Sequence, residues 1–174
     1  MALLSVFTII RAVSLFHLTA AFLFLTNPRA IADQNVIFVL GEAIRVPHVT
    51  SLDKPNEASA FIAILLAFIG LIDLTAASLN EETSLEYWLS NVPVRLVFLF
   101  SLTGYIYLFK EDGLLGSSAI RQEGAGDMVR NSMVFAWAFM ETAAWFWIFT
   151  SLRDERREAL RRRVEKLHAE EDRL

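Results

Sequence analysis

The sequence predicts an all-α integral membrane protein built as a four-helix transmembrane bundle. The chain of 174 residues is 55% hydrophobic, and its mean hydropathy of +0.42 is high for a soluble domain. Four apolar runs each approach or reach the length of about 20 residues that a helix needs to cross a hydrocarbon core of about 30 Å. Backbone groups inside lipid must pair within their own segment, so each run is expected to be a helix.

The expected spans share an apolar composition and fall in one transmembrane domain, residues 1–152, at about 3–25, 58–79, 92–109 and 133–152. Asn27-Pro28 is expected to end the first span, and Asn56 is a candidate N-cap for the second. Pro93 is expected in the first turn of the third span, where its missing N–H costs little. The first run has the position of a signal peptide, but Arg11 interrupts it and a poor cleavage site follows, so a retained helix is expected.

The connection between the first two spans is not purely polar. Five of its apolar residues share one helix face, at Val36, Val39, Leu40, Ala43 and Ile44. The segment is too short to span a bilayer, so the pattern predicts an interfacial helix at about residues 31–46, or one that dips back into the bundle. A helix packed on the ends of the spans is an equally open alternative. By contrast, residues 111–126 are polar and glycine-rich, which predicts a flexible loop.

Residues 153–174 are predicted to form a charged cytosolic helix that continues the fourth span. Glu158 is spaced to pair with Arg161 and Arg162, and Asp154 with Arg157. A thin apolar stripe runs along the same helix through Leu160, Val164 and Leu167. A solvated helix is the plain interpretation, and contact with anionic lipid or with a partner helix is the alternative.

Four spans place both termini on one side of the membrane. Seven basic residues lie in the stretch 153–167, directly after the fourth span. Positive residues favour the cytosolic side, so we expect both termini to be cytosolic.

Five ionisable residues lie within the apolar runs, at Arg11, His17, Asp73, Arg95 and Glu141. Such groups are costly in a membrane and usually face a partner, the bundle interior or a water-filled cavity. Depths estimated at about 1.5 Å per residue predict two ion pairs, Asp73 with Arg95 and Arg11 with Glu141. These pairs favour a structural role. A polar cavity for a lipid headgroup, an ion or a proton, and recognition of a partner subunit, are the functional alternatives.

The sequence does not favour an enzyme. It has no cysteine, no Gly-x-Ser-x-Gly motif and no Gly-rich phosphate loop ending in Gly-Lys-Ser/Thr. Its histidines are His17, His48 and His168, which lack metal-ligand spacing. Asp73 and Glu141 are a conceivable acid–base pair, but their expected arginine partners would keep both charged. We therefore expect no catalytic residue, no cofactor and no metal site.

Several segments resemble the fungal "increased loss of mitochondrial DNA" protein family. The most specific is Asn91-Val-Pro-Val-Arg-Leu-Val-Phe-Leu-Phe100, and Gly70-Leu-Ile-Asp-Leu74 is also similar. Further similar segments are Gly41–Pro47 and the junction from Glu141 to Arg157, so that the resemblance runs from about Ile10 to Glu158. The resemblance implies an endoplasmic reticulum membrane protein with an effect on mitochondrial genome maintenance. It implies no enzymatic activity and no site residue.

The expected function is that of a non-catalytic accessory or scaffold subunit in a larger endoplasmic reticulum membrane complex concerned with lipids. The expected partners are membrane lipids and a larger integral membrane protein, with no nucleic acid. A small ion or proton channel, or a lipid transporter that uses the intramembrane charges, is the alternative. A lipid-modifying enzyme ranks third.

Overall fold

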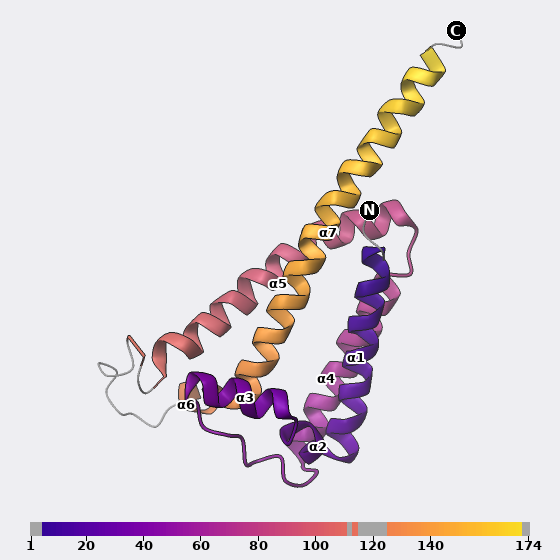
Figure 1. Ribbon diagram of the computed structural model, residues 1–174. Coiled ribbons are helices and arrows are strands. Elements are labelled where there is room, and N and C mark those ends of the chain that lie inside the picture. The colour runs from indigo at the N-terminus through magenta and orange to yellow at the C-terminus, as the bar shows by residue number, and fades with distance from the viewer. Residues whose placement is uncertain (1–4, 111–112, 115–124, 172–174) are drawn as a thin grey trace.

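The computed structural model describes residues 5–110, 113–114 and 125–171, and every regular element within them is a helix (Figure 1). The helices in chain order are α1 (Val6–Thr26), α2 (Pro28–Ala32), α3 (Asn35–Ile44), α4 (Glu57–Ala76), α5 (Glu81–Phe109), α6 (Ala125–Val129) and α7 (Ser132–Glu171). Four of them, α1, α4, α5 and α7, are long and apolar enough to cross a membrane, as the sequence predicts.

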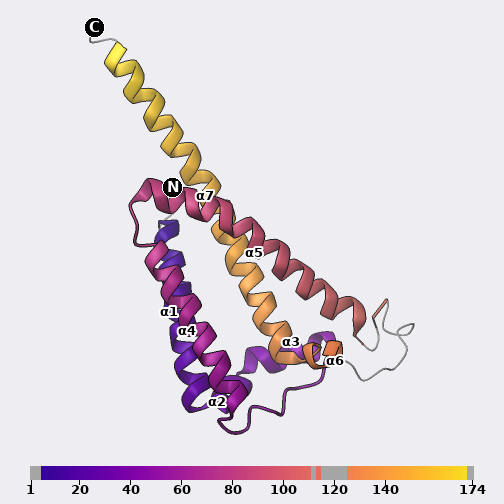
Figure 2. The same ribbon diagram turned by 180° about the vertical axis from the view of Figure 1, so that it is seen from behind.

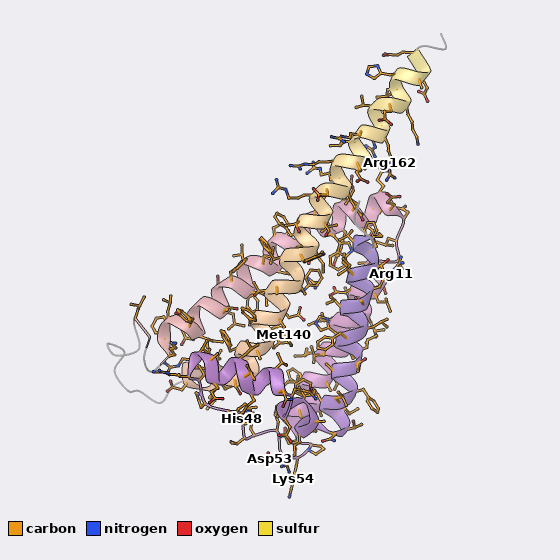
Figure 3. All side chains as sticks on the ribbon, viewed as in Figure 1. Arg11, His48, Asp53, Lys54, Met140 and Arg162 are labelled. Atoms are coloured by element: carbon orange, nitrogen blue, oxygen red, sulfur yellow. The ribbon has the colours of Figure 1, made fainter. Side chains whose placement is uncertain are left out.

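The four long helices form two pairs. α1 packs along α4, and α5 packs along α7, while α2 and α3 lie at the end where α1 finishes (Figures 1 and 2). The start of α1 lies beside α7, because Glu155 Oε1 accepts a hydrogen bond of 2.9 Å from the backbone N–H of Val6. Arg11 and Arg162 mark this end in Figure 3, and His48, Asp53 and Lys54 mark the opposite end.

Polar residues cap the starts of two spans. Asn56 accepts a hydrogen bond from the backbone N–H of Ser59, whose hydroxyl accepts one from the N–H of Asn56, so the predicted cap of α4 is confirmed. Asn80 caps α5 by accepting a hydrogen bond of 2.9 Å from the N–H of Thr83. These caps satisfy N–H groups that have no partner within their own helix.

The third span starts earlier than predicted. α5 begins at Glu81 rather than at residue 92, and Pro93 lies inside the helix. An internal proline removes one backbone hydrogen bond and costs about 3 kcal/mol. The Asn80 cap and the fully buried Trp88, which stacks on Trp145 with 5.5 Å between ring centroids, both favour the longer helix. Pro93 predicted the start of a helix at about residue 92, but packing keeps α5 continuous through the proline.

The connection between α1 and α4 also differs from the prediction. The single helix expected at residues 31–46 is divided into α2 and α3, and α3 packs across α7. α3 buries Ile37 and Gly41, while Val36 and Val39 of the predicted face are exposed. Gly41 sets this orientation, because a Cβ atom built on it would lie 2.5 Å from Cβ of Ser132 in α7.

Gly41→Ala should therefore destabilise the fold by about 1–3 kcal/mol, the usual cost of forcing an extra carbon into a packed contact. Gly104 is a matched control within α5, because a Cβ there would have no atom within 4 Å. Gly104→Ala should be neutral or stabilising by about 0.5–1 kcal/mol, since alanine favours the helix. Thermal unfolding in detergent measures both, and equal effects of the two changes would contradict the close approach of α3 to α7.

α7 continues without interruption into the charged tail, as predicted. Arg162 lies 3.5 Å from Glu158, and Arg157 lies 3.8 Å from Asp154. Two further ion pairs, Arg162–Glu81 at 3.9 Å and Arg163–Glu82, join the tail to the first turn of α5. These exposed pairs contribute about 0–1 kcal/mol each. Most of the loop predicted at residues 111–126 lies outside the described residues.

Candidate functional site

Asp73 of α4 and Arg95 of α5 form the predicted ion pair. Arg95 Nη1 donates to Asp73 Oδ2 at 2.7 Å, and Nη2 donates to Oδ1 at 2.6 Å. Asn91, one helical turn before Arg95, accepts a further bond of 2.6 Å from Nε. The Asp73 side chain is 1% exposed and that of Arg95 is 24% exposed. A bidentate, charge-assisted contact of this kind is among the stronger polar interactions in proteins.

Two indole rings complete the surroundings of Arg95. Its guanidinium carbon lies 4.5 Å from the Trp145 ring centroid and 5.4 Å from that of Trp88. Both distances fit a cation–π contact, which is worth about 2 kcal/mol or more when it is desolvated. Neither tryptophan is among the five residues of the predicted intramembrane polar cluster. The signal was present in α5, because Trp88 lies two helical turns before Arg95 and so on nearly the same face.

Glu141 of α7 is buried, with 6% of its surface exposed, and both carboxylate oxygens have partners. His17 Nε2 lies 2.8 Å from Oε1, and Trp145 Nε1 donates to Oε2 at 2.7 Å. The Trp145 bond joins residues one helical turn apart. The His17 bond joins α7 to α1. His17 is therefore the partner of Glu141 on α1, where Arg11 was predicted.

The predicted pair of Arg11 with Glu141 is therefore wrong. Arg11 is exposed, and its Nη2 donates a bond of 2.8 Å to the carbonyl oxygen of Ala77 at the end of α4. Helix C-termini carry unpaired carbonyls and partial negative charge, so they are favourable partners for a cation. The register explains the difference: α1 and α7 are antiparallel with Val6 beside Glu155, which brings Glu141 level with His17.

These contacts form one network across the four long helices. The ion pair Asp73–Arg95 connects α4 to α5, and the bond His17–Glu141 connects α1 to α7. Trp145 belongs to both contacts, since its N–H binds Glu141 while its ring lies against Arg95. The two helix pairs are thus held together by two polar bridges that share one indole.

The network has the chemistry of a structural connection. Each carboxylate is bound by a side chain from another helix, and four residues of the network, His17, Asp73, Glu141 and Trp145, are buried. Within the described residues, no group of three or more histidine, aspartate or glutamate side chains is placed to hold a metal ion. His48 lies outside the network, with Nδ1 3.2 Å from the hydroxyl of Ser132.

Over the residues that the structure describes, the fold and the network define an all-helical protein with four candidate membrane spans, whose buried charges are paired between helices. The chain belongs to the family described as "Increased loss of mitochondrial DNA protein 1", whose profile matches residues 4–162, and the resemblance noted above is thereby confirmed.

Two relatives show how far the similarity extends. The chain is 28% identical to Protein ILM1 of Saccharomyces cerevisiae over 157 residues, which cover 90% of this chain and 68% of that protein. It is 27% identical to Protein ilm1 of Schizosaccharomyces pombe over 168 residues, covering 91% of each chain. No solved structure matches the chain.

Proposed function

We propose that this chain is a non-catalytic, multi-span protein of the endoplasmic reticulum membrane that acts as an accessory or scaffold subunit of a larger, lipid-related complex. The main support is that both carboxylate oxygens of Glu141 have a partner, one in His17 and the other in Trp145. A carboxylate held in this way is suited to fixing helices in register. The family name suggests a link to mitochondrial DNA, and residence in the endoplasmic reticulum would make that link indirect.

The same contacts favour the scaffold function over a channel for ions or protons. A pathway needs polar groups that can bind a passing ion and release it. Asp73 and Glu141 are instead bound to Arg95, His17 and Trp145. The cavity that reaches His17 has an apolar surface.

We further propose that the end of the bundle carrying the start of α1 and the tail faces the cytosol. The seven basic residues of the tail at 153–167 follow the fourth candidate span directly, whereas the two connections on the other side share six: Arg29, Arg45, Lys54, Lys110, Arg121 and Arg130. Positive charge near a span favours the cytosolic side.

Purification of the tagged chain in mild detergent, with quantitative mass spectrometry, tests the proposed function. We expect one or a few larger integral membrane proteins at near-stoichiometric yield, and no ion flux or lipid exchange when the purified chain is placed in liposomes. Glu141→Gln should leave this set of partners unchanged. A homo-oligomer without partners, with a flux that Glu141→Gln abolishes while the protein remains stable, would replace the scaffold with a channel.

A further inference from the structure

An apolar cavity of about 340 Å³ lies between the two helix pairs, toward the end closed by α2 and α3. α1 and α4 supply one wall, which includes Phe16 and Leu66. α7 supplies the opposite wall, which includes Trp137 and Met140. Met140 is labelled on α7 in Figure 3. The volume falls in the range of about 300–1,000 Å³ that is typical of ligand pockets.

The cavity surface offers water no polar partner. His17 is part of the wall, but its Nε2 is bound to Glu141, and its Nδ1 is buried and does not reach the apolar surface of the cavity. A buried water needs two to four polar partners, and apolar cavities stay dry or take up apolar molecules. The cavity is therefore suited to a hydrocarbon ligand.

The opening of the cavity points to the source of that ligand. Three of the lining residues are exposed: Phe16 by 52%, Ile62 by 37% and Leu65 by 44%. All three belong to candidate spans, α1 and α4, whose outer surface would meet the hydrocarbon of a bilayer. Met133 and Met140 on the other wall have flexible side chains that adapt to chains of different shape.

We propose that this cavity binds one hydrocarbon chain of a membrane lipid, which enters sideways from the bilayer. The chain fills the space between the α1/α4 pair and α7, next to the bond between His17 and Glu141. It completes a contact between the helix pairs that the protein's own side chains leave open. The inference rests on the proposed position of the four candidate spans in a membrane, and it specifies where lipid is bound.

Photo-crosslinking of the purified full chain tests this site. The probe is a phospholipid that carries a diazirine on one acyl chain, in mixed micelles or nanodiscs, and mass spectrometry locates the labelled residues. We expect labelling to be several-fold stronger in the cavity segments of α1 and α7 than at Val94 and Val97, which are exposed on the outer face of α5.

A variant whose cavity is filled by a larger side chain can be compared with a control variant on the same helix. Ala20 lines the cavity, whereas Ala12 is exposed on the same helix. Ala20→Phe should reduce labelling of the cavity segments several-fold and leave the melting temperature in lipid-free detergent unchanged or raised, while Ala12→Phe should change neither. If Ala20→Phe does not fold, Leu66→Phe fills the same space from α4.

Equal labelling of the cavity and of the outer face of α5 would overturn the proposal, as would full cavity labelling in a folded, cavity-filled variant. The experiment uses the isolated chain, so its result is independent of partner proteins. A chain that has partners but no cavity label refutes the lipid site alone. A chain with a cavity label but no partners refutes the scaffold role alone.

Discussion

Arg95→Leu should lower the free energy of unfolding by about 3–5 kcal/mol, the usual cost of breaking a buried ion pair by removing one partner. The reason is Asp73, which is 1% exposed and would lose its bidentate donor in a low-dielectric site. The change also removes the cation from the faces of Trp88 and Trp145. The loss is measured by chemical or thermal unfolding in detergent.

A double-mutant cycle isolates the pair. The combined change Asp73→Asn with Arg95→Leu should be less destabilising than the sum of the two single changes, because the neutral amide is easier to bury than an unpaired carboxylate. Arg29→Leu is the control, since Arg29 pairs with Asp33 on the surface at 3.2 Å and should contribute about 1 kcal/mol or less. Additive effects in the cycle would show that Asp73 and Arg95 are not energetically coupled.

Glu141→Leu should be nearly as damaging, with an expected loss of about 2–5 kcal/mol. It leaves His17 Nε2 and Trp145 Nε1 without their shared acceptor, and each buried unpaired group costs about 1–3 kcal/mol. The loss should appear in the same detergent melts and be accompanied by a lower yield of folded protein.

Glu141→Gln separates the hydrogen bonds from the charge. The amide oxygen can accept from Trp145, and the amide N–H can donate to His17 if the ring carries its proton on Nδ1. We therefore expect a loss of only about 1 kcal/mol, from replacing charged hydrogen bonds by neutral ones. If glutamine and leucine were equally damaging, the charge of Glu141 would matter more than its two hydrogen bonds.

The apolar pattern of the sequence was enough to predict the four long helices, since length and hydropathy alone identify a candidate span. It also predicted the partner of Asp73, because Asp73 and Arg95 lie in consecutive spans joined by a short connection. The partner of Glu141 depends on the register of α1 against α7, which are distant in sequence. That register is seen in the contact of Val6 with Glu155, and Glu155 lies beyond the last apolar run.

The stacking of Trp88 on Trp145 could not be predicted from the sequence for a related reason. Trp88 precedes the predicted third span, and Trp145 has the same sequence pattern whether it faces lipid or a neighbouring helix. Only the crossing of α5 with α7 brings the two rings together. Pro93 shows the opposite case, in which a strong local signal was outweighed by packing. The role of Gly41 could not be predicted either, because the residue that requires a glycine there, Ser132, belongs to a helix far along the chain.

The division of the network between the two helix pairs matters for biosynthesis. Translation produces α1 and α4 first, so His17 and Asp73 are made before their partners on α5 and α7 exist. Until the second pair arrives, the nascent chain carries an uncompensated carboxylate in a span, at a cost of a few kcal/mol. A ribosome stalled or a chain truncated after α4 would leave this defect exposed.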